Sequence, residues 1–258
     1  FDLGRFIVDF GIIPMKLVLD APVAEIATTA NESTVTLVNG TKFTSDYVMV
    51  TVPIGVLQAG SIKFTPALPE THTKAIAKLG VGVRNTAVAS WPADVAFNFF
   101  TNLTFDDGTF PLSFDFDVAS ANAETRGMFN GFLNGIKLAG TPTLTSFATG
   151  KYGRKMETLT DASVQADFMA NLKKVFPSAP EPTGFNVSRW GQEPYSKGWY
   201  SFAKVGATPA DYTTLLTPFG GSETNARVAF AAEYATVGNS GTMRGAFDAA
   251  TLTMVLAL

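Results

Sequence analysis

The stretch FAAEYATVGNSGTMRGAF, Phe230–Phe247, decides the fold. An apolar segment typical of a buried strand ends in one acidic residue, Glu233, and a loop of small residues leads into a helix expected at 242–256. In α/β folds, ligands bind where a strand ends and a helix begins, because the first N–H groups and the helix dipole attract electron-rich groups. The stretch therefore predicts a ligand site formed by Glu233 and the backbone of Thr242 and Met243.

The same residues allow a second interpretation. Glu233 could cap a neighbouring segment or pair with an arginine, and the glycines could form only a tight turn. Both interpretations stay open at the level of this stretch alone.

The composition limits what the chain can bind. With 258 residues, 46% of them hydrophobic, it can build one large or two modest domains around a substantial core. Charged residues make up 16% and the net charge is −3, so no basic surface for nucleic acid and no polybasic run for anionic lipid is expected. The 22 phenylalanines fit dense packing, and some of them could form an apolar surface that a partner covers.

The rare residue types exclude several kinds of chemistry. The chain has no cysteine, which excludes disulfides, thiolate catalysis and cysteine metal sites. Its one histidine, His72, excludes a two-histidine metal site, and we expect no metal. His72 lies in ALPETHTKAIAKLG, which predicts a helix over 71–79 with Gly80 as its C-cap and a histidine on the surface.

Targeting signals are few. No run of 18 uncharged apolar residues occurs, so we expect no transmembrane helix, and the apolar segment Met243–Leu258 reads as a buried core helix. The first residue is Phe1 rather than Met, which leads us to expect a processed or partial product. Sequons for N-glycosylation favour a secretory route, and they lie at Asn31, Asn39, Asn102 and Asn186.

The hydrophobic pattern mixes strands and helices and predicts an α/β class. Val35 and Leu37 alternate with threonines, which indicates a half-buried strand, and Asn39-Gly40 predicts a type I′ hairpin turn after it. Further strands are expected at 15–19, 23–26, 47–52, 87–91, 112–118, 128–136, 144–148 and 227–232. In the strand at 112–118, alternation explains Asp115 and Asp117 as a solvated face rather than as catalytic acids.

The clearest helix is TDASVQADFMANLKKVFP. Thr160 or Asp161 is its expected N-cap. Apolar residues recur at helical spacing, at Val164, Phe168, Leu172 and Val175. By contrast, LGVGVRN (Leu79–Asn85) is no phosphate-binding loop, because a helix precedes it and a strand follows it.

Three stretches together resemble one family. Thr51–Gly82 (TVPIGVLQAGSIKFTPALPETHTKAIAKLGVG), Arg189–Ser201 (RWGQEPYSKGWYS) and the opening stretch resemble, in order, patterns of the flavin-dependent amine oxidases. The similarity is to the branch of polyamine oxidases and histone demethylases, and it covers only the C-terminal half of that family.

The resemblance implies an α/β fold with two domains. An incomplete Rossmann-like FAD domain would comprise residues 1–57 and 189–258, and a mixed-sheet substrate domain would comprise 58–188. It also implies hydride removal from a C–N bond by FAD, with reoxidation by O₂. The implied FAD contacts are Val23, Glu233, Thr242 and Met243, and the implied walls of the flavin and substrate site are Trp190, Trp199 and Tyr200.

The chain departs from the family pattern in places that concern the cofactor. The half that carries the GxGxxG loop for the pyrophosphate is absent from this sequence. Thr86 stands where the family has a lysine that reaches the flavin through water, so the catalytic residue is unknown. Three further departures are Ala232 for a glycine, Arg244 for a histidine, and Ala249-Ala250 for Ser-Gly.

Two hypotheses follow, beside a third possibility that these residues are only part of a longer chain. In the first, the chain is the C-terminal portion of an amine oxidase and acts with a complementary N-terminal segment; alone it is inactive. In the second, it is a non-catalytic descendant that serves as a structural or interaction subunit, with other protein subunits as partners.

Overall fold

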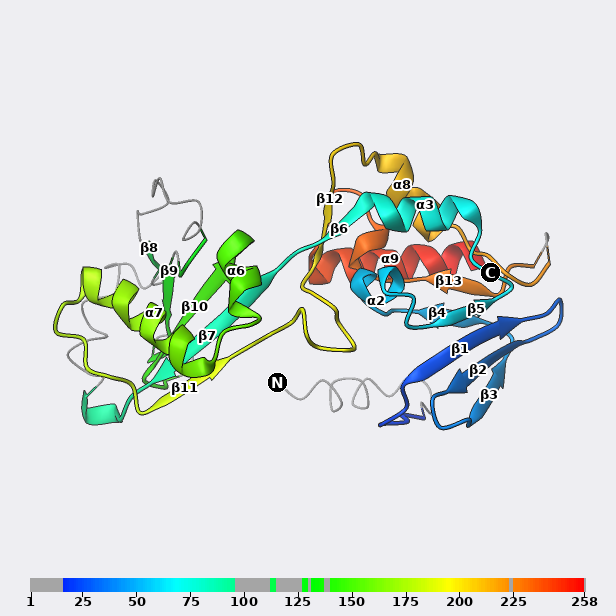
Figure 1. Cartoon of the computed structure of the whole chain (residues 1–258). Coiled ribbons are helices and arrows are strands. Elements are labelled where there is room, and N and C mark those ends of the chain that lie inside the picture. The colour runs from blue at the N-terminus through cyan, green and yellow to red at the C-terminus, as the bar shows by residue number, and fades with distance from the viewer. Residues whose placement is uncertain are drawn as a thin grey trace.

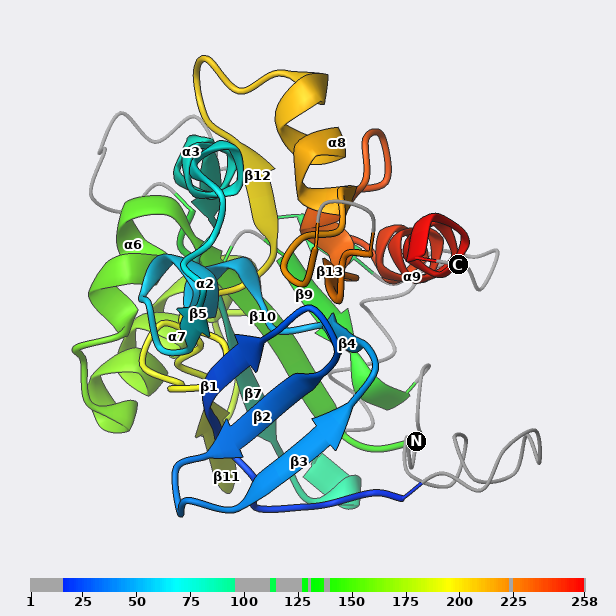
Figure 2. The ribbon, with the colours of Figure 1, turned by 90° about the vertical axis from the view of Figure 1, so that its right-hand side faces the viewer.

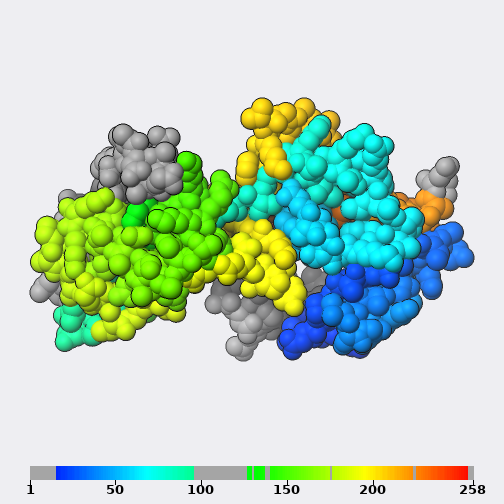
Figure 3. Space-filling view, viewed as in Figure 1, coloured from blue at the N-terminus to red at the C-terminus, as the bar shows by residue number. Residues whose placement is uncertain are grey.

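The computed structural model describes residues 16–95, 112–114, 127–129, 131–136, 140–222 and 225–257. They form two units, each with its own hydrophobic core, joined by two crossing segments (Figures 1 and 3). The first unit, on the right in Figure 1, contains the described N- and C-terminal parts, and the second contains the middle of the chain. The mixture of strands and helices confirms the expected α/β class.

A four-stranded sheet lies at one end of the first unit. Its order is β3-β2-β1-β5, with bounds Lys42–Ser45, Ser33–Leu37, Val23–Thr28 and Lys63–Thr65. Strand β1 pairs antiparallel with β2 and parallel with β5. The predicted type I′ turn is wrong: of its two central residues only Gly40 has a positive φ, 85°, and the Asn39 side chain instead accepts a hydrogen bond from the N–H of Thr41.

The first core lies between that sheet and the helices. Two short parallel strands, β4 (Val48–Val50) and β13 (Val228–Phe230), lie between the sheet and two of the helices, α3 (Glu70–Lys78) and α8 (Pro209–Leu216) (Figure 2). The remaining helices are α2 (Ile54–Gln58), η3 (Glu233–Ala235) and α9 (Met243–Ala257). Ile54, Leu79, Leu215, Phe230 and Tyr234 are among the buried residues of this core.

The second unit packs two helices on a five-stranded sheet. The sheet order is β11-β7-β10-β9-β8, with bounds Gly184–Val187, Arg84–Ser90, Thr143–Thr149, Gly131–Asn134 and Leu112–Phe114. Helices α6 (Gly150–Met156) and α7 (Asp161–Val175) contribute Tyr152, Met156, Phe168 and Leu172 to the second core. Phe168 makes edge-on ring contacts with Phe132 at 5.1 Å between centroids, which explains the tight fit of α7 on the sheet.

The prediction for α7 is confirmed. Thr160 is the N-cap, and its hydroxyl accepts the N–H of Ser163 at 3.2 Å. Val164, Phe168 and Leu172 are fully buried. Asp115 and Asp117, and the ends of the strands expected at 112–118 and 128–136, lie outside the described residues.

The two units are joined by a short two-stranded ladder. Strand β6 (Leu79–Val81) pairs antiparallel with β12 (Ser201–Ala203), and beside it Gly82 exchanges backbone hydrogen bonds with Trp199 and Tyr200, both at 2.9 Å. The prediction that Gly80 is a helix C-cap is therefore wrong. Gly80 lies in β6 and leaves room for the ring of Phe202, which a Cβ at this position would contact.

Two other predictions are wrong. His72 is buried rather than on the surface, because α3 packs on α8. The imidazole Nε2 of His72 donates to the carbonyl of Thr217 at 2.9 Å. Residues 16–19 form no strand. The first core includes Ile76 and Leu79, and the described strands from β7 to β11 belong to the second unit. The domain bounds at 58 and 188 stay a prediction.

Among the described residues, no helix is both long enough and apolar enough to cross a bilayer. In the same residues, no three acidic or histidine side chains gather in a way that could hold a metal ion.

Candidate functional site

Glu233 is the centre of a hydrogen-bonded junction. It follows β13 and begins η3, and its Oε1 accepts the N–H of Ser201 at 3.0 Å. Its Oε2 accepts the hydroxyl of Ser201 and the N–H of Gly241, both at 2.6 Å. The Ser201 hydroxyl also lies 3.0 Å from that of Ser240. One carboxylate thus joins the end of β13, the start of β12 and the loop before α9.

The junction leaves Glu233 with acceptor capacity. A carboxylate offers about four lone-pair positions, and the bonds from Ser201 and Gly241 use only part of that capacity. The neighbouring Tyr234 is fully buried, and its hydroxyl has no partner in the described part of the chain. Burial, and then the charge of Glu233, raises the pKa of Tyr234, so this phenol stays protonated.

The start of α9 is open. Gly241 has a φ of 76°, and a Cβ there would lie 3.1 Å from the Tyr200 ring. Thr242 acts as the N-cap, because its hydroxyl accepts the N–H of Gly245 at 3.0 Å. The N–H groups of Thr242 and Met243 have no acceptor within the described residues, and the Met243 side chain is 92% exposed. Both N–H groups are therefore available to a ligand.

Three aromatic side chains form a wall beside this helix start. The rings of Trp190 and Trp199 meet edge to face at 5.3 Å between centroids, and those of Trp199 and Tyr200 at 6.3 Å. Trp190 and Tyr200 are 38% and 41% exposed. Because Tyr200 packs next to Gly241, the wall and the helix start belong to one site. We call these three residues the aromatic wall.

A buried polar clamp, formed by Asn85 and Glu157, holds the backbone of the aromatic wall, and no sequence motif indicated it. The side-chain oxygen of Asn85 accepts the N–H of Trp190 at 3.0 Å. The amide of Asn85 donates to the Glu157 Oε1 at 2.6 Å and to the carbonyl of Gly153 at 3.1 Å. Glu157 Oε1 also accepts the N–H of Gly191 at 3.0 Å. Asn85 is fully buried, so these bonds fix the backbone of the wall.

Thr86 follows Asn85 on β7 and lies on the opposite face of the sheet. Its N–H donates to the hydroxyl of Ser188 at 2.8 Å, and its cross-strand partner is Phe147. Two residues earlier, the guanidinium of Arg84 lies 3.7 Å from the centre of the Phe147 ring and 5.8 Å from that of Trp199. Thr86 and Arg84 thus both have Phe147 as a neighbour, and Arg84 also reaches Trp199.

Val23 and Ala232 lie in the first unit. Val23 begins β1, pairs with Leu37 and packs partly buried against the first core. Ala232 is buried in the same core with extended backbone, so its methyl group is accommodated by packing. Glu233 and Tyr200 both lie against Gly241, which precedes Thr242. Val23 takes part in no contact with Glu233, Thr242 or Tyr200 among the described residues.

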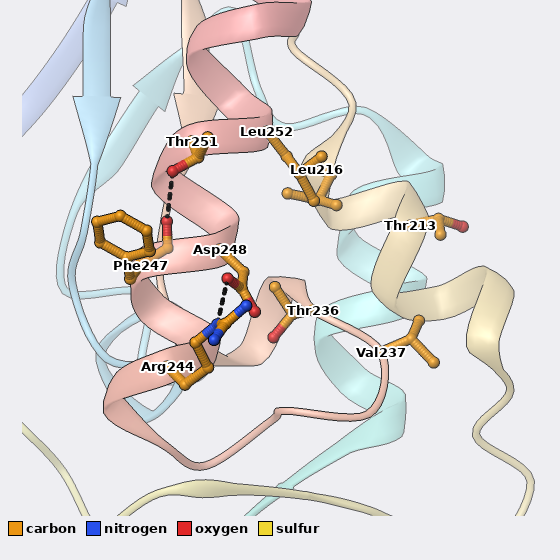
Figure 4. A pocket seen from close by; sticks show the side chains of 9 residues that line it. All are labelled: Thr213, Leu216, Thr236, Val237, Arg244, Phe247, Asp248, Thr251 and Leu252. Atoms are coloured by element: carbon orange, nitrogen blue, oxygen red, sulfur yellow. Dashed lines mark hydrogen bonds and ion pairs between the residues drawn. The ribbon is translucent and has the colours of Figure 1, made fainter.

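A pocket of about 490 Å³ lies between α8 and α9 (Figure 4). Its lining includes Leu216, Val237, Phe247 and Leu252. Arg244 also borders it and donates to Asp248 at 2.7 Å, which lowers the pKa of that carboxyl. The spacing of Arg244 and Asp248 on a helix was the only sequence signal for this ion pair.

Comparison with known proteins identifies the family of this chain. Residues 12–253 match the family of flavin containing amine oxidoreductases. The chain is 36% identical over 230 residues to polyamine oxidase 4 of Oryza sativa subsp. japonica, covering 89% of this chain and 42% of that protein. It is 34% identical over 183 residues to lysine-specific histone demethylase 1 homolog 3 of Arabidopsis thaliana, covering 70% and 10%.

Solved structures agree on the fold. A wild-type putrescine oxidase bound to putrescine superposes with a TM-score of 0.72 at 19% identity, covering 93% of this chain and 49% of that one. Cyclohexylamine oxidase from Brevibacterium oxydans IH-35A gives a TM-score of 0.66 at 21% identity, covering 93% and 49%. The chain therefore spans less than half the length of polyamine oxidase 4 and about half that of the two solved structures. It belongs to the flavin-containing amine oxidase family.

Proposed function

We propose that this chain is the C-terminal portion of a flavin-dependent, polyamine-type amine oxidase that oxidises a C–N bond with FAD and O₂ once a complementary N-terminal half is present. The observation that carries the proposal is the junction of Glu233 with Gly241, which holds the free N–H groups of α9 beside the aromatic wall. On its own, the chain lacks a loop for the pyrophosphate, and we expect it to be inactive.

The described residues fit FAD. The Thr242 and Met243 N–H groups suit the electron-rich edge of a flavin ring, and the helix dipole adds to their effect. The remaining lone pair of Glu233 suits one hydroxyl of the ribityl or ribose part. Val23 begins β1, a strand of the first sheet. By the family resemblance, we propose that the adenine part of FAD lies near this strand.

The chain's own residues would orient the reactants and keep water away. FAD supplies the acceptor for the hydride when it is bound. Trp190, Trp199 and Tyr200 offer flat apolar surfaces that confine an amine, and the clamp of Asn85 and Glu157 keeps them in place. Thr86 provides a hydroxyl but no ammonium group.

The first unit has apolar surface that suits the complementary half. Met243 and Phe247, one helical turn apart on α9, are 92% and 70% exposed. Strand β4 pairs with a strand on one edge only within the described residues, and parallel sheets are normally larger and covered on both faces. A partner that adds strands beside β4 and packs on α9 would satisfy both features.

The test uses the full-length protein that contains this chain. We expect bound FAD, released on denaturation, and peroxide formation with an amine substrate. Glu233→Ala should lose FAD affinity, whereas Glu32→Ala, a change at an exposed glutamate of the β1–β2 turn, should keep it. A folded full-length protein without flavin would overturn the proposal.

A second candidate is a catalytically inactive structural or interaction subunit. The observation that favours it is Thr86, which cannot supply the ammonium function of the family lysine. The discriminating experiment is peroxide production by full-length protein that retains FAD. Retained FAD without turnover of any amine would support this second candidate.

We also propose passage through the secretory route. The sequons at Asn31, Asn39 and Asn186 are exposed, and Asn102 lies outside the described residues. A glycosidase that lowers the mass of protein from its native source would support this. An unchanged mass would argue against it.

A further inference from the structure

The sheet of the second unit has two different faces. One face packs on α6 and α7 and includes Ala87, Ala89, Leu144 and Ala148, all fully buried. The alternating residues lie on the other face and are only partly buried in β7 and β10. We call this second surface the open face. It carries Arg84, Thr86, Val88, Ser90, Thr145 and Phe147.

Within the described strands, the open face carries a charge at one position. In the described strands of this sheet, Arg84 is the only charged residue, and none of those strands contains an aspartate or glutamate. A cationic ligand that lay along this face would therefore meet no opposite charge from these strands. It would meet a like charge at Arg84, which disfavours binding.

Arg84 lacks an anionic partner in the described part of the chain. Its guanidinium lies over the Phe147 ring at 3.7 Å, and Trp199 is 5.8 Å away. Stacking on the aromatic rings holds the guanidinium of Arg84 in place and offsets part of the free energy of its desolvation. It leaves the N–H donors at the edge of the planar guanidinium without acceptors in the described part of the chain. A planar fork of this kind matches the two oxygens of a carboxylate.

Arg84 lies next to the aromatic wall. It shares the open face with Thr86, about 7 Å along the strand from it. Trp199, which contacts Arg84, is itself in ring contact with Trp190 and Tyr200. In Figure 1, β7 begins at the end of the second sheet that is nearer the first unit, where the crossing segments lie. Its first residue, Arg84, therefore borders the proposed amine site.

We propose, resting on the amine oxidase part of the proposed function, that Arg84 determines the substrate class. The preferred substrate is an amine whose far end carries a carboxylate rather than a second ammonium group, which departs from the polyamine-type substrate that the family resemblance implies. The aromatic wall confines the amine end, and Arg84 binds the carboxylate end. Arg84 is thus a specificity-determining residue, and it takes no part in bond breaking.

The experiment compares two probes of equal length in the full-length protein, 4-aminobutanoate and 1,4-diaminobutane. Binding is followed by tryptophan fluorescence, which reports on Trp190 and Trp199 and needs no turnover, and kcat/KM is measured where turnover occurs. We expect the wild type to prefer the carboxylate probe by about tenfold or more, the scale of one charge-assisted hydrogen bond.

Variants show whether Arg84 is responsible. Arg84→Gln should abolish the preference, Arg84→Lys should keep part of it, and Lys16→Gln, which removes an exposed cation of the first unit, should leave it unchanged. If Arg84→Gln does not fold, the proposal is tested by the preference of the wild type and by the reduced preference expected for Arg84→Lys. A wild type that prefers the diamine, binds neither probe, or keeps its preference in Arg84→Gln overturns the proposal. If the protein lacks FAD but still binds the carboxylate probe through Arg84, the proposed oxidase function is wrong and the proposed selectivity of Arg84 is correct.

Discussion

The Oε2 atom of Glu233 accepts the backbone N–H of Gly241 at 2.6 Å, and this bond ties the end of β13 to the start of α9. The two residues are eight positions apart, and the loop between them returns to the strand end because of this carboxylate. The alternative that Glu233 caps a neighbouring segment is thus correct for its contacts within the chain. The same bond prepares the helix start for a ligand.

We predict that Glu233→Gln destabilises the protein by about 1–3 kcal/mol, because the new amide group faces donors at Ser201 and Gly241 and leaves one of them unpaired. Urea unfolding measures the change. Glu32→Gln, at an exposed position, should stay within about 0.5 kcal/mol of the wild type. Equal stability of the two variants would show that the junction is dispensable.

Asn85→Ala should loosen the aromatic wall. The substitution leaves the N–H of Trp190 and the Oε1 of Glu157 without their buried partner, at a cost of about 2 kcal/mol or more. We expect a lower unfolding midpoint together with altered tryptophan fluorescence in the native state. Asn186→Ala, on the exposed side of the same sheet, is the matched control. Unchanged fluorescence in Asn85→Ala would contradict a positioning role.

Gly55→Ala should displace the loop before Trp199. A Cβ at Gly55 would lie 2.7 Å from the carbonyl oxygens of Ser196 and Lys197, which are backbone atoms and cannot rotate away. Such overpacking costs about 1–3 kcal/mol. Gly60→Ala meets open space, but its φ of 63° costs about 1 kcal/mol. Only Gly55→Ala should change tryptophan fluorescence, and a change in both variants would argue against a local cause.

The stability of the first unit should fall as the pH drops below about 6.5, the ordinary pKa of histidine. Burial lowers the pKa of His72 in the folded state, so the unfolded chain takes up a proton at higher pH than the folded chain. The stabilisation by neutral, buried His72 is complete above the pKa of the unfolded chain. It is lost as the pH falls through the lower pKa of His72 in the folded chain. Its slope is at most about 1.4 kcal/mol per pH unit.

His72 is the only histidine of the chain, so a single variant isolates this effect. His72→Gln keeps a donor for the carbonyl of Thr217 and removes the titration. The difference in unfolding free energy between pH about 7 and about 5 should shrink in this variant, since Asp and Glu change little in that range. A difference equal to that of the wild type would show that His72 is not responsible.

Local signals in the sequence were sufficient for part of this structure. The cap at Thr160 and the spacing of Val164, Phe168 and Leu172 lie within one helix, so they predicted α7 correctly. The position of Glu233 between an apolar strand and a glycine-rich loop likewise predicted where the strand ends and the helix starts.

Long-range contacts explain what the sequence could not show. His72 is buried only because α8, more than 130 residues later, supplies the carbonyl of Thr217. Gly80 was predicted as a helix end because its strand partner, Phe202 of β12, lies more than 120 residues later. Asn85 contacts Glu157 and Trp190, which are 72 and 105 residues away in the sequence, and no local spacing indicates these contacts.

In the ladder of β6 and β12, the chain passes from the first unit to the second through β6 and returns through the neighbouring strand β12. An insertion whose two ends lie side by side behaves as a cassette: it can be exchanged for another of different length or surface without moving the core that hosts it. Lineages with this architecture can therefore alter the lining of the open face, including Arg84, while the Glu233 junction stays as it is.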